Sequence, residues 1–458
     1  MFPRTPLKAK SVAGLKNTDL ALIFPVLVLL VIGPTQATFA QTYTWSTIAG
    51  LGGVSGTDDG VGSKARFNAP WGIAVDGSGT SYIVDSGNQL IRMLALVGTN
   101  WNITTIAGSV AAWHDVDGTN SQANFLQPYG IAADSSSPTT LYITDQKVNT
   151  AGAVRSLRYL GAGIWQSATL VDYFAGGAVA QPTGLALDSA GELFVTLTEQ
   201  NSVIYVSQPG ANWVYSTIAG GGFSHPGTTD GTNLVAFFNG PAATAVDASG
   251  NVYVADTENH TIRKLALLSG TANWVTTTIA GTPGISGNAD GMNGAALFNG
   301  PDGLAVDSSG HIFVADANNN TIRKVTPQGT NWIATTIGGQ LNRSHGTNDG
   351  VGAASSFYHP AGLAVDNLGR VFVADYQNNT IRMGIPSAIT NPPPALQMAT
   401  AGNSAYVMWP YSDTGYVLQY STNLNSGPWV TVAGGISTNL VFTGLMTDRQ
   451  TFYRLLQP

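Results

Sequence analysis

Six copies of one short segment divide this chain and constrain its fold more than any other feature. In each copy a proline is followed six residues later by an aspartate, with mostly small or apolar residues between them. The copies begin at Pro70, Pro128, Pro182, Pro241, Pro301 and Pro360. Their prolines are 54 to 60 residues apart, a period that suits a propeller blade of about four strands. Because one such sheet cannot bury its own apolar face, the repeat predicts a ring of six blades.

The fifth copy indicates four strands, at 301–307, 311–316, 321–326 and 331–339, separated by Gly- and Asn-rich turns. The last strand of each copy begins near a tryptophan, and these are Trp45, Trp101, Trp165, Trp213, Trp274 and Trp332. Trp45 precedes the first copy, and no such strand follows the last one. We therefore expect residues 43–50 to supply the outer strand of the sixth blade and to close the ring.

The second and third strands carry a recurring pair of charges. Five copies have an aspartate and an arginine there: Asp85 and Arg92, Asp145 and Arg155, Asp256 and Arg263, Asp316 and Arg323, and Asp375 and Arg382. The third copy has Leu197 and Ile204 instead, so both charges are replaced together by apolar residues. Since losing only one partner would leave a buried charge unpaired, this joint replacement predicts a structural ion pair within each blade.

The loop before five of the copies has an Asp-Gly pair and a phenylalanine at constant spacing. The aspartates, eleven residues before the repeat proline, are Asp59, Asp117, Asp230, Asp290 and Asp349. The phenylalanines, eight residues after them, are Phe67, Phe125, Phe238, Phe298 and Phe357. The pattern predicts a turn whose aromatic residue fills the space between neighbouring blades.

The N-terminus is typical of an export signal. Basic residues precede an apolar run from Ala21 to Ile32, and a small-residue cleavage site ends at Ala40. This run is shorter than the ~20 residues that span a membrane, so residues 1–40 are expected to be cleaved without leaving a transmembrane segment. The remaining chain has 15 basic and 25 acidic residues, a net charge of −10, which disfavours nucleic-acid binding. Cysteine is absent, which excludes disulfides and thiol chemistry.

The run GNVYVADTENHTIRKL, from Gly250 to Leu265, resembles the NHL repeat, as do HIFVADANNNTIRKV and RVFVADYQNNTIRM in the next two copies. The resemblance covers residues 43–384, and six copies make it specific. It implies an all-β, six-bladed propeller over residues 41–384. NHL-like propellers include protein-binding and RNA-binding modules, a zinc-dependent lyase and lactonase-type enzymes, so the fold does not assign a function.

The C-terminal part has a different pattern. Residues 385–396 contain three consecutive prolines and are expected to form a stiff linker. Residues 397–458 contain five or six short alternating strands, in which Trp409, Tyr420, Trp429, Leu445 and Tyr453 resemble the core of a fibronectin type III-like sandwich. Because the chain stops where a last strand would begin, we expect an abbreviated module.

The residue after each repeat proline is expected at the mouth of the central channel. This position varies while its neighbours do not, so packing does not dictate it. Trp71 and Tyr129, on adjacent blades, could form a stacking platform for a sugar ring or an apolar side chain, and Asp302 would lie at the same mouth. The alternative is that these residues only plug the channel.

Three histidines stand before the loop aspartates of alternate blades: His114, His225 and His345. Three histidines with an open position are typical of catalytic zinc, but their nitrogens would have to converge on one ion, which loops around a wide ring rarely achieve. Asp-rich loops at Asp58-Asp59 and Asp115–Asp117 resemble fragments of calcium sites and lack the distal glutamate. We therefore assign no catalytic residue, no metal and no cofactor, and keep zinc or calcium as the alternative.

These observations favour an exported, non-enzymatic binding, adhesion or scaffold protein, secreted outside the cell or held in the periplasm or at the cell surface. One propeller face would hold a protein or carbohydrate partner. The alternative is a metal-assisted hydrolase or lyase, similar to a lactonase or an amidating lyase, with its site at the channel mouth.

Overall fold

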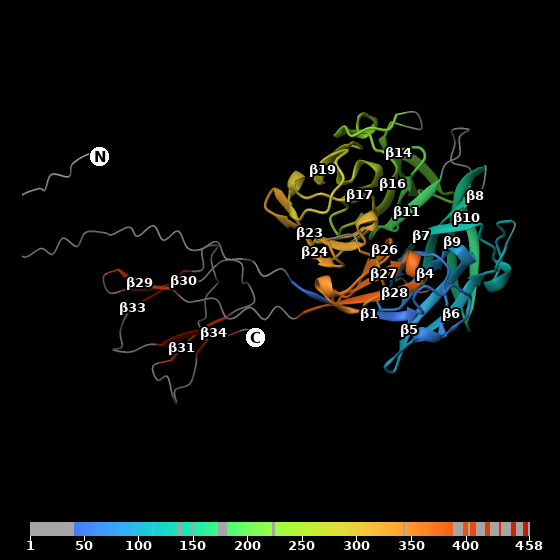
Figure 1. The fold of residues 1–458 in the computed structure, drawn as a ribbon. Coiled ribbons are helices and arrows are strands. Elements are labelled where there is room, and N and C mark those ends of the chain that lie inside the picture. The colour runs from blue at the N-terminus through green and yellow to red at the C-terminus, as the bar shows by residue number, and fades with distance from the viewer. Residues whose placement is uncertain are drawn as a thin grey trace, which may run out of the picture. The chain divides into compact units, whose positions relative to one another are not determined.

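The fold is a closed ring of six antiparallel sheets in a computed structural model (Figure 1). The structure describes residues 41–112, 114–134, 139–147, 150–172, 181–221, 225–341 and 344–387, and six short strands between residues 397 and 456. The expected export segment 1–40, linker residues 388–396, and both Trp409 and Trp429 lie outside the described residues.

Each blade is a meander that runs from the central channel outward. The strands of the first three blades are β3 (Pro70–Val75), β4 (Ser81–Asp85), β5 (Leu90–Val97) and β6 (Asn100–Gly108); β7 (Gln127–Asp134), β8 (Thr140–Lys147), β9 (Thr150–Gly161) and β10 (Ile164–Asp172); and β11 (Pro182–Leu187), β12 (Leu193–Leu197), β13 (Ser202–Ser207) and β14 (Val214–Gly220). The innermost strands are nearly all apolar and buried, as expected for strands covered on both faces.

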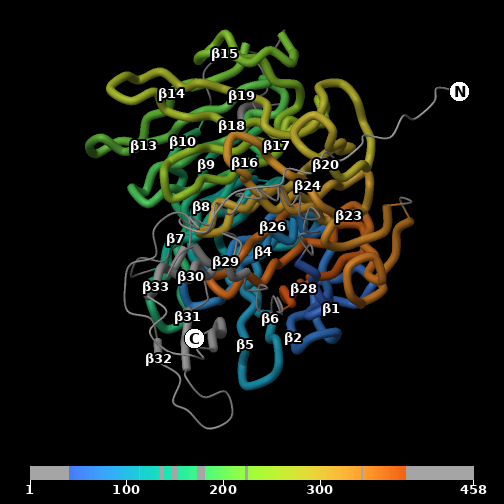
Figure 2. The backbone as a smooth tube through the Cα atoms, turned by 90° about the vertical axis from the view of Figure 1, so that its left-hand side faces the viewer, coloured from blue at the N-terminus to red at the C-terminus, as the bar shows by residue number. Residues whose placement is uncertain are grey.

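The other three blades repeat this order. Their strands are β16 (Pro241–Val246), β17 (Val252–Asp256), β18 (Thr261–Leu267) and β19 (Trp274–Ala280); β21 (Pro301–Val306), β22 (Ile312–Asp316), β23 (Thr321–Gln328) and β24 (Asn331–Gly338); and β26 (Pro360–Val365), β27 (Val371–Asp375) and β28 (Thr380–Pro386) with β1 (Tyr43–Gly50). The inner strands neighbour one another in sequence order, and β26 neighbours β3 (Figure 2). The expected six-bladed propeller is confirmed.

The N-terminal strand closes the ring. In Figure 1 the blue β1 lies beside the orange β28, and Thr47 pairs with Arg382 and Trp45 with Gly384. In the first blade, Thr105 of β6 pairs with Arg92, and Trp101 pairs with Leu96, four residues after that arginine. Trp45 instead pairs with Gly384, only two residues after Arg382. Tyr43 therefore occupies the register of the other outer-strand tryptophans, so Trp45 is not a sixth equivalent of them.

Gly338 and Gly384 leave room for the indole of Trp45 at this position. A Cβ atom would lie 2.5 Å from the Trp45 ring on Gly338 and 2.7 Å from it on Gly384. Trp45 is 1% exposed, and its indole Nε1 donates to the carbonyl of Ile337 on β24 at 2.9 Å. One side chain thus fixes the closing strand of the sixth blade to the fifth blade.

Four blades carry a fifth, two-residue edge strand beyond the four that the sequence predicts. These strands are β2 (Gly60–Val61), β15 (Gly231–Thr232), β20 (Gly291–Met292) and β25 (Gly350–Val351). The short 3-10 turns are η1 (Gly62–Lys64), η2 (Ser86–Asn88), η3 (Asn120–Gln122), η4 (Asn233–Val235), η5 (Thr257–Asn259), η6 (Asn293–Ala295), η7 (Ala317–Asn319), η8 (Gly352–Ala354) and η9 (Tyr376–Asn378). The edge strands come from the Asp-Gly loops, which therefore pair with the blade instead of standing free.

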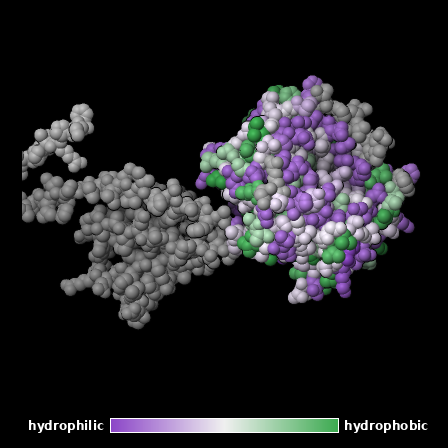
Figure 3. Space-filling view, viewed as in Figure 1, coloured by the Kyte–Doolittle hydropathy of each residue, from purple (hydrophilic) through white to green (hydrophobic). Residues whose placement is uncertain are grey.

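The hydrophobic core lies between neighbouring blades. The five loop phenylalanines are fully buried, and Phe67 packs with Ile83 of the first blade and Ile381 of the sixth. The expected aromatic plug is therefore present. Burying one such side chain contributes about 1.5–3 kcal/mol. On the outer surface seen in Figure 3, apolar side chains form small, separate groups among hydrophilic ones.

The C-terminal strands pair into two sheets of three. The strands are β29 (Gln397–Ala401), β30 (Ser404–Met408), β31 (Val417–Ser421), β32 (Val430–Thr431), β33 (Val441–Leu445) and β34 (Phe452–Leu456). Their orders are β29-β30-β33 and β32-β31-β34. Among all described residues, no helix has the length and apolar character needed to cross a membrane.

Candidate functional site

A ring of glycines sets the width of the central channel. The second residue after each repeat proline is glycine in five blades, and an added Cβ would lie 1.9 to 2.6 Å from the backbone carbonyl oxygen of the next blade. A Cβ atom on Gly303 would clash with the carbonyl oxygen of Ala361 in the sixth blade, and one on Gly362 with that of Trp71 in the first blade. The same close approach is therefore found where the ring closes. Only residues without side chains allow the inner strands to approach this closely.

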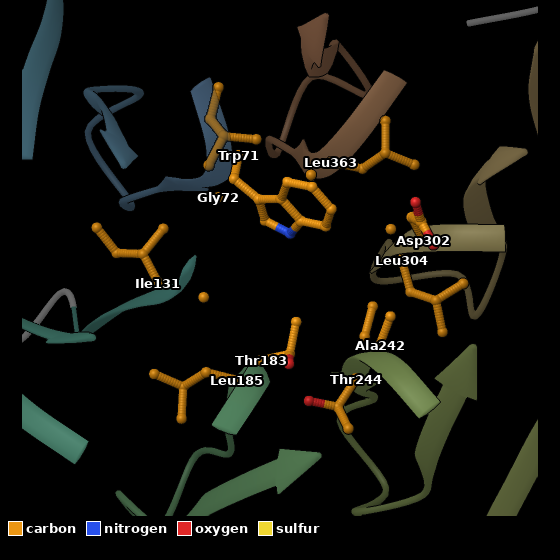
Figure 4. A pocket seen from close by; sticks show the side chains of 16 residues that line it. Trp71, Gly72, Ile131, Thr183, Leu185, Ala242, Thr244, Asp302, Leu304 and Leu363 are labelled. Carbon is orange, nitrogen blue, oxygen red and sulfur yellow. The ribbon is translucent and has the colours of Figure 1, made fainter. Parts of the chain in front are cut away.

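The channel itself is small. Its free volume is about 50 Å³, which is room for a few water molecules and not for a metabolite. Trp71, Thr183, Ala242 and Asp302 line it, and all four directly follow a repeat proline. In Figure 4 the indole of Trp71 extends over the opening, with its nitrogen facing the centre, and Asp302 lies at the edge. A ligand would therefore bind over the mouth, against these side chains.

Trp71, which lines this mouth, contacts two further aromatic rings, and the three rings form an arc. The ring centroid of Trp71 lies 5.2 Å from that of Tyr129 and 5.1 Å from that of Tyr376. Tyr376 comes from η9 of the sixth blade, so the arc joins the sixth, first and second blades. Sequence reasoning brings Trp71 and Tyr129 together correctly and misses Tyr376.

The rings do not form the flat platform that the sequence suggests. The interplanar angles to Trp71 are 80° for Tyr129 and 78° for Tyr376, so each pair meets edge to face. A sugar ring stacks best on one continuous aromatic face, which rings packed edge to face do not provide. The shape of the mouth therefore differs from the expectation although two of its residues are the expected ones.

An acid and a histidine continue the arc on the other side. The ring of His359 lies 5.7 Å from that of Tyr376, and His359 Nδ1 lies 3.9 Å from Asp302 Oδ2. The side chain of Asp302 is 12% exposed. Its burial, followed by the negative charges of Glu258 and Asp316, raises the pKa of Asp302 to about 7. Burial lowers the pKa of His359, which favours its neutral form.

His359 has a strained backbone. Its φ is 49°, in the left-handed region where residues other than glycine are uncommon. Glycines occupy the equivalent positions in the fourth and fifth blades, where Gly240 and Gly300 have φ of 59° and 60°. Keeping a histidine at a position that suits glycine costs about 1–2 kcal/mol and is typical of functional sites. No pattern in the sequence singles out this residue.

The charged residues of the second and third strands lie inside each blade. Arg92, Arg155, Arg263, Arg323 and Arg382 contact Asp85, Asp145, Asp256, Asp316 and Asp375 at 2.6 to 3.2 Å, and every one of these side chains is buried. In the third blade, Leu197 and Ile204 are buried among apolar residues at the matching positions. The ten residues support the fold and do not face the mouth.

Each arginine also binds the loop aspartate, which sequence reasoning treats as a turn residue. Arg92 Nη2 lies 2.7 Å from Asp59 Oδ1, and its guanidinium lies 5.2 Å from the centre of the Phe67 ring. Both contacts recur in the second, fourth, fifth and sixth blades, which carry the other four arginines. These loops are therefore fixed to the blades, which leaves the channel mouth as the candidate site.

The three loop histidines are not brought together. His225 stacks on Phe237 with ring centroids 6.5 Å apart, and His345 stacks on Tyr358 at 4.1 Å, while His114 is exposed. Within the part of the chain that the structure describes, no group of three His, Asp or Glu residues is placed to hold a metal ion. Each histidine stays in the loop of its own blade, too far around the ring to share a ligand position.

Comparison with known proteins identifies the repeats. The NHL repeat family matches residues 238–265, 298–325 and 357–382. A relative named NHL repeat-containing protein 2, from Bos taurus, is 31% identical over 307 residues, which cover 58% of this chain and 40% of that protein. The Arabidopsis thaliana protein SUPPRESSOR OF QUENCHING 1 is 27% identical over 60% of this chain and 26% of its own length. The chain thus spans less than half the length of these relatives.

Solved structures share the architecture. An auxiliary nutrient binding protein from Bacteroides thetaiotaomicron has a TM-score of 0.57 and 17% identity, covering 76% of this chain and 77% of that one. Its Bacteroides ovatus counterpart has the same TM-score at 16% identity, covering 76% and 78%. At such identities the likeness concerns the fold alone. The chain contains NHL repeats, and they form a six-bladed propeller.

Proposed function

We propose that this NHL-repeat propeller is an exported binding protein that holds a protein or glycan partner over the mouth of its central channel. The observation that carries the proposal is the arc of Trp71, Tyr129 and Tyr376 beside a nearly buried carboxyl group. Packing does not require Trp71 or Tyr129, because small residues fill the same position in other blades: Thr183, Ala242 and Ala361. Aromatic and charged side chains gathered over an opening are typical of recognition sites.

Location and accessory parts belong to the same proposal. Residues 1–40 would direct export, and the mature protein would act outside the cell, in the periplasm or at the cell surface. The C-terminal strands would form an abbreviated fibronectin type III-like module that acts as a spacer. The pairing of these strands into two sheets, β29-β30-β33 and β32-β31-β34, supports this assignment.

Binding is favoured over the alternative of a metal-assisted hydrolase or lyase. That mechanism needs ligands that converge on one ion, and His114, His225 and His345 lie in separate loops. Asp302 and His359 could exchange a proton, but beside Asp302 the channel is lined mainly by apolar residues and two threonines, Thr183 and Thr244. Elemental analysis of the purified protein distinguishes the two. Stoichiometric zinc or calcium, lost in His225→Ala or Asp302→Ala, would favour the enzyme.

The binding proposal is tested with glycan arrays and pull-down experiments on the full-length secreted protein. We expect partners to be captured by the wild type and lost in the double variant Trp71→Ala with Tyr129→Ala. Leu368→Ala is the matched control, because Leu368 is a 72% exposed apolar residue in the β26–β27 turn, at the opposite end of the inner strand. Partners that bind the double variant and the wild type equally would overturn the assignment of this surface.

A further inference from the structure

We propose that the channel mouth recognises an organic ammonium group, surrounded by the rings of Trp71, Tyr129 and Tyr376 and paired with Asp302. The inference rests on the proposed binding function and names the chemistry of its ligand. The ammonium could belong to a lysine side chain of a protein or to an amino sugar of a glycan. The same chemical group is recognised in either case.

The first argument is the shape of the aromatic arc. Each tyrosine ring meets the Trp71 ring nearly at a right angle, at 80° and 78°. Rings packed edge to face offer no continuous flat surface to a sugar ring. The face of an aromatic ring carries partial negative charge and attracts a cation within about 6 Å of its centre. The face of Trp71 at the opening therefore suits an ammonium group better than a stacked sugar ring.

The second argument is that Asp302, when ionised, has no cationic partner among the described residues. Its closest potential cation is His359, at 3.9 Å, and burial keeps that imidazole mainly neutral. The other charges that act on Asp302 are those of Glu258 and Asp316, both negative. Arg323 already pairs with Asp316 and with the loop residue Asp290, so the structural ion pairs do not serve Asp302. A ligand cation would supply the missing partner.

The third argument is the cost of building the site. Asp302 keeps a carboxyl group with little solvent, beside the left-handed backbone of His359. The backbone strain alone does not mark a site, because Ala69 has a φ of 52° at the same position of the first blade. The buried carboxyl group lowers stability, and such a cost persists where a ligand repays it. This corner of the mouth lies next to the aromatic arc, because Tyr376 contacts both His359 and Trp71.

The test measures binding of small probes to the full-length secreted protein by calorimetry at pH 8. Choline carries the cation alone, glucosamine and glucose differ by one amine, and Nα-acetyl-lysine amide is matched by its Nε-acetylated form. We expect choline and the amine probes to bind, and each neutral counterpart to bind at least about tenfold more weakly. Stronger binding of the lysine probe or of glucosamine identifies the source of the ammonium.

Variants separate recognition from folding. Asp302→Asn and Trp71→Ala should each weaken choline binding at least about tenfold. Tyr376→Phe, which keeps the ring, should bind like the wild type, and Tyr376→Leu should not. If Tyr376 only supported the fold, the Phe and Leu variants would bind choline with the same affinity whenever their thermal stabilities are equal.

Two results would overturn the inference alone, and a third would overturn the proposed function with it. Glucose that binds as tightly as glucosamine, in a Trp71-dependent manner, would exclude an ammonium ligand and leave the proposed binding function intact. Choline affinity unchanged by Asp302→Asn would exclude the ion pair. Absence of any probe, glycan or protein partner whose binding depends on Trp71 would overturn the proposed function as well.

Discussion

Arg92 Nη1 lies 2.8 Å from Asp85 Oδ2, and neither side chain is exposed to solvent. The same guanidinium lies 2.7 Å from Asp59 in the loop and donates to the backbone carbonyls of Arg66 and Asp58. One arginine thus joins the middle of a blade to the loop that precedes it. Because the contact recurs in five blades, the rigidity of the ring depends on charges that never meet a ligand.

Breaking one such pair should cost far more than replacing both partners. Arg263→Ile alone leaves the buried carboxyl group of Asp256 without its cation, and Asp256→Leu alone leaves Arg263 with only the half-exposed Asp230. Each single change should lower the free energy of unfolding by about 3–5 kcal/mol. The double variant copies the third blade, with its Leu197 and Ile204, and should recover most of this loss. Urea unfolding of the two single variants and the double variant measures the coupling.

The exposed arginine Arg158 provides the control for this cycle. Arg158→Ile should change the stability by no more than about 0.5 kcal/mol, because the side chain is exposed. Strictly additive costs of Asp256→Leu and Arg263→Ile would contradict a stabilising buried pair.

Replacing a glycine of the channel ring with alanine should separate the inner strands of two blades. Gly303→Ala would place a Cβ atom 1.9 Å from the carbonyl oxygen of Ala361, so the inner strands of two blades must separate. We expect a loss of about 2–3 kcal/mol, seen as a lower midpoint of thermal unfolding. Gly210→Ala is the control, because no atom lies within 4 Å of its added Cβ. Equal midpoints for the two variants would show that the ring is not tightly closed.

The repeated features of the fold are predictable from the sequence because repetition exposes them. The third blade replaces Asp and Arg together by Leu197 and Ile204, which indicates that the two charges contact each other. The absence of a tryptophan strand after Arg382 indicates that residues 43–50 close the ring. The loop aspartates are misjudged because Asp-Gly suits a turn, and Asp59 is 33 residues from its partner Arg92.

The site is less predictable because its residues differ from blade to blade. No pattern marks Tyr376 as aromatic, because the other five blades have Ser86, Gln146, Thr198, Thr257 and Ala317 at this position. The positive φ of His359 is visible only in the structure. The histidines of alternate blades share a spacing, but spacing along the chain does not bring loops around a ring to one point.

Closure by the N-terminal strand should depend on Trp45. Trp45→Ala removes a fully buried ring from between the fifth and sixth blades and should cost about 3–5 kcal/mol. Trp45→Phe keeps most of the packing but loses the hydrogen bond to Ile337, which should cost about 1 kcal/mol beyond the lost packing. Trp101→Ala, at a half-buried outer position, should cost less than Trp45→Ala in the same thermal unfolding experiment. Equal costs for these two variants would show that Trp45 has no special role in closure.

The buried carboxyl group of Asp302 should lower stability as the pH rises. The pKa of about 7 in the folded chain lies above the ordinary value of 3.8, so the folded state binds the proton more tightly. Its contribution is therefore present below about pH 4 and is lost as the pH rises toward 7. Asp302→Asn should raise the free energy of unfolding at pH 8 by roughly 2–4 kcal/mol and change it little at pH 4. Urea unfolding at both values measures this difference, and equal effects at both would contradict it.

Choline binding should follow the same ionisation, since choline itself does not titrate. Affinity should fall as the pH decreases through about 7, where Asp302 gains its proton. The charged groups that face Asp302 are Glu258 of η5, Asp316 of β22 and His359 before β26. Protonation of His359 at lower pH would add repulsion in the same direction. Calorimetry between pH 5 and pH 9 measures the midpoint, and an affinity independent of pH would contradict the pairing.

The strained histidine offers a test that separates stability from binding. His359→Gly relieves the strain of a φ of 49°, but glycine also has more conformational entropy in the unfolded chain. The net effect should be a rise in the free energy of unfolding of about 0.5–1 kcal/mol. It also opens Asp302 to water, so the pH midpoint of choline binding should move to a lower value. Ala69→Gly is the matched control, because Ala69 has a φ of 52° and donates its backbone N–H to Asn379 as His359 does to Asn320. Both variants should gain stability, and only His359→Gly should shift the midpoint. If both shift it equally, or neither does, His359 does not shield Asp302.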